Sequence, residues 1–167
     1  SEMCIRDSLK AQALMVFLGE EPRLTRDSDI SLHSDRAETI RQKKVSDLKN
    51  RVALVDSVPN ALLISVHQNH FTDSRYKGSQ VFFNRGDQNR QWGECAQEIF
   101  RQILAPDNER KAKSMPENIY LFDHISCPAI LVECGFLSNG EEAALLSTET
   151  YQRKVAVALA GAYYAHK

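Results

Sequence analysis

The sequence has few glycines and prolines, no surplus of charge and no long apolar run. Its 167 residues include only 7 Gly and 5 Pro, and 43% are hydrophobic, which excludes collagen-like and disordered chains and fits one globular domain. Because 21 basic residues balance 22 acidic ones, the sequence shows no electrostatic footprint for nucleic acid. The longest apolar run, residues 11–18, is interrupted by Gln12 and is too short to cross a bilayer, so we expect no membrane span.

Cysteine is also scarce. The four cysteines, at positions 4, 95, 127 and 134, form no C-x-x-C pair and no spacing typical of a disulfide framework or a zinc knuckle. We therefore expect buried free thiols.

The N-terminus has no signal-peptide pattern of basic, apolar and small residues. The opening octet, residues 1–8 (SEMCIRDS), resembles a translated sequencing-adapter tail. We therefore expect residues 1–8 to be a non-native tail and residues 9–167 to form the domain.

Short apolar strands alternate with amphipathic helices along the chain. Apolar residues at helical spacing predict helices at residues 9–18, 37–55, 92–104 and 151–162. Strands are predicted at residues 23–26, 61–66, 79–83, 119–122 and 129–132, and a surface loop at 107–117. This alternation predicts an α/β fold: a three-layer sandwich with a largely parallel or mixed central sheet and helices on both faces.

Two of these strands lead directly into ionisable residues. Residues 61–66 run into His67, and residues 129–132 run into Glu133. If the strands are parallel, both side chains face one crevice at their carboxyl ends. A histidine and a carboxylate there suit a metal ligand and a general base for hydrolysis. The alternative, two polar residues that merely end their strands, stays open.

Four segments of the chain match known motifs. They are residues 63–69 (LISVHQN), 128–139 (PAILVECGFLSN), 24–26 (LTR) and 78–83 (GSQVFF). In these segments the chain resembles the zinc-dependent N-acetylmuramoyl-L-alanine amidases that cut peptidoglycan (peptidoglycan amidase type 3). The HQNHF sequence at 67–71 and the YKG sequence at 76–78 are most similar to the branch that processes spore cortex.

The resemblance implies hydrolysis of the amide between N-acetylmuramic acid and L-alanine, with Zn²⁺ as cofactor and peptidoglycan as partner. His67 would be a zinc ligand and Glu133 the catalytic acid/base. The family has two further ligands, a His in a G-H-G-G loop and a Glu in its first helix. This sequence contains no G-H-G-G, and counting back from residues 24–26 places the Glu near Glu2.

We therefore expect a family member truncated at its N-terminus, without the family's first strand and the start of its first helix. The resemblance also implies action at the cell wall, outside the cytoplasmic membrane, although the chain shows no signal peptide. We expect a monomer.

Several other residues are candidates for the site. His33, His70 and His124 are possible substitute ligands, and Asn69, Arg26 and Arg51 are candidates for substrate binding. Cys134 could be a thiol nucleophile with His67 as its base, but strand alternation places Cys134 on the side opposite Glu133. Three hypotheses stay open: a zinc amidase, an incomplete fragment or wall-binding module without catalysis, and a thiol hydrolase.

Overall fold

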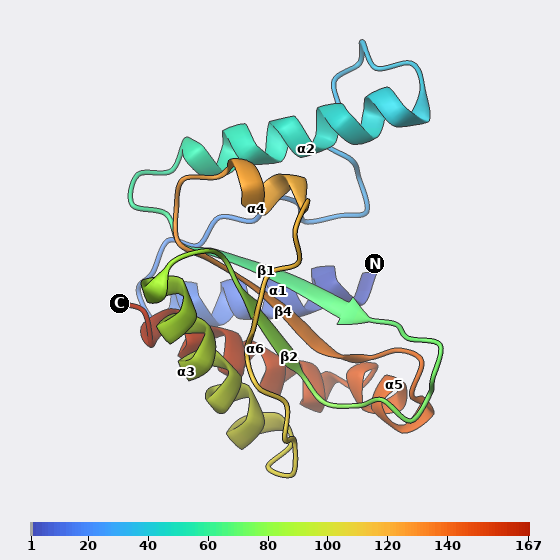
Figure 1. Cartoon of the computed structure of the whole chain (residues 1–167), viewed down its shortest axis with the longest axis vertical. Coiled ribbons are helices and arrows are strands. Elements are labelled where there is room, and N and C mark those ends of the chain that lie inside the picture. The colour runs from blue at the N-terminus through green and yellow to red at the C-terminus, as the bar shows by residue number, and fades with distance from the viewer. Residues whose placement is uncertain (1) are drawn as a thin grey trace.

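The computed structural model describes residues 2–167, which form a four-stranded sheet between two layers of helices (Figure 1). The helices are α1 (Glu2–Phe17), α2 (Ile40–Asp56), α3 (Asp87–Leu104), α4 (Tyr120–His124), α5 (Gly140–Leu146) and α6 (Glu149–Tyr164). The strands are β1 (Leu63–Asn69), β2 (Gln80–Phe83), β3 (Lys113–Ser114) and β4 (Ala129–Phe136).

The sheet is mixed, with the strand order β1-β4-β2-β3. β1 pairs parallel to β4, β4 pairs antiparallel to β2, and β2 pairs parallel to β3. Within residues 2–167, β1 has a strand neighbour on one side only. The predicted three-layer α/β fold with a mixed central sheet is confirmed.

Alternating residues of β4 separate the core into two parts. Ile130, Val132 and Cys134 point into the larger core, which also contains residues of α1, α3 and α6. Ala129 and Leu131 point into the smaller core on the other face, together with residues of α4 and its flanks. In Figure 1, α2 and α4 lie on one side of the sheet, and α1, α3 and α6 lie on the other. A strand buried on both faces needs the continuous apolar run that predicted it.

Side-chain caps fix the starts of α2, α5 and α6. α2 begins with a capping box, in which Gln42 N donates to Thr39 Oγ1 and the Gln42 side chain accepts from Thr39 N. α1 ends before Gly19, whose φ of 88° only glycine adopts without strain. None of the helices described for residues 2–167 combines the length and the apolarity that a membrane span requires.

Two of the predicted strands are wrong. Residues 119–122 belong largely to helix α4, because Ile119, Phe122 and Ile125 recur at a spacing of three and together enter the smaller core. Residues 23–26 form no strand. Side-chain contacts hold the segment instead: Arg51 Nη1 donates to Thr25 Oγ1 at 3.2 Å, and Gln12 Nε2 donates to Pro22 O at 3.4 Å.

Two short elements were missed by the sequence patterns. The predicted loop 107–117 contains the two-residue strand β3, which Phe82 and Phe83 of β2 hold in register. Helix α5 begins where the Asn139 side chain accepts from Glu142 N at 3.0 Å. Of the expected tail, residues 2–8 form the first half of α1, and residue 1 lies outside the described residues.

Candidate functional site

His67 and Glu133 lie side by side in the carboxyl-terminal halves of two parallel strands, β1 and β4. They are register partners between β1 and β4. By strand alternation both side chains point to the face of α2 and α4, while Val66 and Cys134 point to the opposite face. The structure thus brings together the two residues that end the apolar strands of the sequence.

His67 is exposed to solvent, and its Nε2 lies 3.0 Å from Ser65 Oγ. Desolvation by the surrounding atoms, followed by the charges of Arg26 and Arg51, lowers the pKa of His67 below its ordinary value. This shift favours the neutral ring, which is the form that offers a nitrogen lone pair to a metal ion or a proton.

Glu133 is half-buried, and one oxygen of its carboxyl group, Oε2, is buried without a hydrogen-bond partner among the described residues. Burial raises the pKa of Glu133 to about 7. A carboxyl group that gains and loses a proton near neutral pH is suited to general acid/base work.

A hydrolytic zinc ion needs three protein ligands and one open position. Within residues 2–167 no three His, Cys, Asp or Glu side chains come together in a group that could hold a metal ion. Glu2, the candidate ligand in α1, has a side chain that is 77% exposed and that forms an ion pair with Arg6 at 3.4 Å. The donors that this part of the chain brings together do not fit a closed zinc site.

The three substitute histidines do not complete such a group either. His33 lies half-buried in the segment before α2, and His70 is exposed just after β1. His124 ends α4, where its ring stacks on Tyr120 with the centroids 3.9 Å apart. Its Nδ1 lies 2.8 Å from Tyr120 O.

Arg51 and Asn69 lie close to the His67–Glu133 pair. The Arg51 side chain is 15% exposed, and its Nε donates to Asp47 Oδ2 at 2.7 Å. This ion pair fixes the guanidinium group at a place from which its charge acts on His67. The carbonyl oxygen of Asn69 accepts a 2.7 Å hydrogen bond from Leu137 N and so ties the end of β1 to the end of β4. Substrate contact by either residue stays a prediction.

The thiol-hydrolase hypothesis is wrong. Cys134 is 0% exposed and lies in the larger core, on the face of the sheet opposite Glu133. Burial raises the pKa of its thiol well above the ordinary value, which disfavours the thiolate that this mechanism needs. The expectation that all cysteines are buried is also wrong, because Cys95 is exposed on α3.

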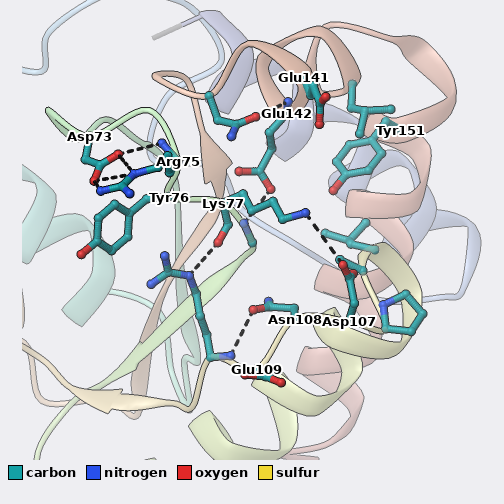
Figure 2. Close-up of a pocket in the computed structure, with 17 residues that line it drawn as sticks. Asp73, Arg75, Tyr76, Lys77, Asp107, Asn108, Glu109, Glu141, Glu142 and Tyr151 are labelled. Carbon is teal, nitrogen blue, oxygen red and sulfur yellow. Dashed lines mark hydrogen bonds and ion pairs between the residues drawn. The ribbon is translucent and has the colours of Figure 1, made fainter.

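A cavity of about 880 Å³ opens at the same edge of the sheet, beyond the end of β4 and the start of β2 (Figure 2). Glu142 of α5 points into it and accepts hydrogen bonds from Gly78 N at 2.9 Å and from Phe136 N at 2.7 Å. Its lining also includes Tyr76, Lys77 and Arg110. None of these was predicted as a site residue. The only signal for Glu142 was Asn139, a typical N-cap residue three positions earlier.

Known proteins share this fold and these strands. The chain is 34% identical, over 153 residues, to the germination-specific N-acetylmuramoyl-L-alanine amidase of Bacillus subtilis (strain 168). The match covers 91% of this chain and 61% of that protein, so the chain spans less than two thirds of its curated relative.

Two solved structures extend the comparison. The structure of the CwlD amidase from Clostridioides difficile in complex with the GerS lipoprotein matches with a TM-score of 0.92 and 33% identity, over 99% of this chain and 84% of that one. The amidase AmiC2 of Nostoc punctiforme matches with a TM-score of 0.77 and 22% identity, over 98% of this chain and 82% of that one, which shows the shared fold. A family model described as N-acetylmuramoyl-L-alanine amidase matches residues 4–163. The chain therefore belongs to the N-acetylmuramoyl-L-alanine amidase family.

Proposed function

We propose that this chain carries the catalytic carboxylate and one metal ligand of an enzyme that hydrolyses the amide between N-acetylmuramic acid and L-alanine in peptidoglycan. The observation that carries the proposal is the pairing of His67 with Glu133 across β1 and β4, with the pKa of Glu133 raised to about 7. The similarity to N-acetylmuramoyl-L-alanine amidases supports the choice of substrate.

Glu133 has the properties that both proton transfers of the reaction require. As a carboxylate it takes a proton from the attacking water, whose oxygen bonds to the amide carbon. As a carboxylic acid it returns a proton to the nitrogen when the carbon–nitrogen bond breaks. A pKa near 7 keeps both forms populated at neutral pH.

We further propose that the enzyme depends on zinc, with His67 as one ligand, and that the remaining ligands are not among these 167 residues. In this proposal residues 1–8 are not native, and the family's first strand and the start of its first helix are missing. Asp7 supports the proposal that residues 1–8 are not native. Its carboxyl group is buried in α1, and Oδ1 has no partner among the described residues, which is a costly arrangement for a native residue.

Zinc content tests this part of the proposal. After gel filtration, elemental analysis of the folded 167-residue protein is expected to give close to zero zinc per chain. The same domain, preceded by the residues that its source locus encodes upstream, is expected to bind one. A zinc ion bound to the 167-residue protein would contradict the proposal and return Glu2, His33, His70 and His124 to consideration.

Activity of the extended protein tests the role of Glu133. We expect it to release peptides with free L-alanine amino termini from purified peptidoglycan, detected by mass spectrometry. Glu133→Gln should keep the zinc content while turnover falls by about 10²–10⁴-fold. Glu94→Gln, which neutralises an exposed carboxylate on α3, is the matched control and should leave turnover unchanged. Full activity of Glu133→Gln would refute the assignment.

A wall-binding module without catalysis is the second candidate. The absence of a three-ligand group among residues 2–167 favours it. If the extended protein contains no further ligands, sediments with insoluble peptidoglycan and releases no peptide, this candidate replaces the enzyme.

The relatives also suggest the biological setting. One is described as germination-specific, and another was solved in complex with a lipoprotein. We therefore propose action on the spore cortex or cell wall, outside the cytoplasmic membrane. The monomeric state is a prediction that light scattering of the purified protein will test.

A further inference from the structure

Arg110 presents a rigid, partly buried guanidinium group in the wall of the cavity. Its Cζ lies 4.7 Å from the ring centroid of Phe136 and 5.6 Å from that of Tyr76. Its Nε donates to the carbonyl oxygen of Lys77 at 2.8 Å. Two aromatic rings and a backbone carbonyl therefore fix this side chain in place, which removes most of the entropy cost of using it to bind.

The charge of Arg110 is not neutralised within the described chain. The other two cations of the cavity form ion pairs: Arg75 with Asp73 at 2.7 Å, and Lys77 with Asp107 at 3.9 Å. Figure 2 shows Lys77 and Asp107 reaching toward each other. Among the residues described, no carboxylate pairs with Arg110, and its terminal nitrogens donate no hydrogen bond. A guanidinium group with two terminal nitrogens available is a bidentate receptor for a carboxylate.

Arg110 is connected to the candidate catalytic pair through β4. Phe136, on which the guanidinium group stacks, ends the strand that carries Glu133, three residues earlier. Phe136 is also the register partner of Asn69, which ends the strand that carries His67. The exposed ring of Phe71 follows Asn69 and contacts Tyr76, with the centroids 4.8 Å apart. A chain of side-chain contacts, from Phe71 to Tyr76 and from Tyr76 to Arg110, therefore connects the end of β1 with Arg110.

We propose that Arg110 binds a carboxylate of the peptide portion of the substrate, and that the cavity is the subsite for this peptide. The inference rests on the proposed function. In an N-acetylmuramoyl peptide the lactyl carboxyl group is already part of the amide, so the carboxylates belong to the peptide and not to the sugar. A cavity of about 880 Å³ has the size of a site for a short peptide.

Calorimetric binding of a product-like peptide tests the proposal without any turnover. The probes are the tripeptide L-alanyl-γ-D-glutamyl-diaminopimelate and an analogue in which every carboxylate is a carboxamide. The unaltered protein is expected to bind the acid about tenfold or more tightly than the carboxamide. Arg110→Gln should lose about tenfold for the acid and nothing for the carboxamide, while Arg110→Lys should fall between.

Arg41→Gln, which removes an exposed charge from α2, is the matched control and should bind as the unaltered protein does. Equal binding of the acid by Arg110→Gln and the unaltered protein overturns the proposal. So does equal binding of acid and carboxamide by the unaltered protein, a comparison that involves no variant. Competition by the disaccharide without a peptide, lost in Arg110→Gln, would make this a sugar site and also overturn it.

The binding test and the activity test can fail separately. Glu133→Gln is expected to bind the tripeptide normally, because its carboxyl group takes no part in holding the peptide. Peptide binding that depends on Arg110 in a protein without hydrolysis would refute only the proposed function. Hydrolysis that is unaffected by Arg110→Gln, in both kcat and KM, would refute only this inference.

Discussion

Gln68 Nε2 donates a 2.7 Å hydrogen bond to Oδ2 of Asp7 and thereby joins the strand residue next to His67 to helix α1. Asp7 is 1% exposed, and its Oδ1 has no partner among the described residues. Burial raises the pKa of Asp7 to about 7, and the Gln68 hydrogen bond offsets only part of that effect. The larger core therefore holds a carboxyl group that is costly to ionise.

Asp7→Asn is expected to stabilise the protein at alkaline pH. The folded-state pKa of about 7 lies above the ordinary value of 3.8, so ionisation of Asp7 progressively destabilises the fold as pH rises from about 4 to about 7. Asn keeps an acceptor for Gln68 and carries no charge. Urea unfolding at pH 8 should show a gain on the order of 3 kcal/mol, and at pH 4 almost none. Asp27→Asn, an exposed control, should show no such gain, and an equal gain at both pH values would contradict the explanation.

Glu142→Ala is expected to destabilise the fold by about 2–4 kcal/mol. The substitution leaves the backbone N–H groups of Gly78 and Phe136 without their carboxylate acceptor, and the side chain is buried. Glu141→Ala removes an exposed carboxylate one residue earlier and should change stability by less than about 0.5 kcal/mol. Thermal unfolding followed by circular dichroism compares the two, and equal effects would show that Glu142 does not support these loops.

Gly78→Ala is expected to cost more than Gly19→Ala. Both glycines have positive φ, 91° and 88°, and therefore share the backbone penalty of about 1–2 kcal/mol. A Cβ at Gly19 would meet no atom within 4 Å, whereas one at Gly78 would lie 2.7 Å from Asn108 Oδ1. Asn108 is buried and donates to Ser79 O at 2.9 Å, so it cannot move away cheaply. Denaturant unfolding should show a further loss of about 1–3 kcal/mol for Gly78→Ala, and equal losses would mean that Asn108 adapts.

Cys95 and Cys134 are expected to differ strongly in reactivity. Cys95 is exposed on α3, while Cys134 is 0% exposed and its thiol has a raised pKa. A thiol-labelling reagent followed by peptide mass spectrometry should modify Cys95 within minutes and Cys134 only when denaturant is added. Rapid labelling of Cys134 in the folded protein would show that the larger core opens.

The sequence predicted those parts of the fold whose burial can be recognised from the residue pattern of a single segment. β4 is buried on both faces, so its run of apolar residues identified a central strand, and the end of that run identified Glu133. The same logic identified β1 and His67. Residues 119–122 were misassigned because four apolar or aromatic residues fit a short strand and a helical turn equally well.

The cavity could not be predicted from the chain alone. Arg110, Tyr76 and Phe136 come from three segments far apart in sequence, and only the antiparallel pairing of β2 with β4 brings the loops before β2 and after β4 together. Glu142 joins them through α5, a helix of seven residues with too little periodicity to recognise. A single sequence records what each residue is but not which distant loop it meets.

β1 carries His67 and is also an edge strand of the described sheet, with β4 as its single strand neighbour. Its other side presents backbone donors and acceptors in the spacing of a strand. An extended peptide that forms main-chain hydrogen bonds with this edge would add a strand to the sheet. It would also reduce the motion of the backbone that holds His67. Strand addition would thus be linked to order at the candidate catalytic pair, so hydrogen exchange at residues 63–69 would report an added strand before any activity is measured.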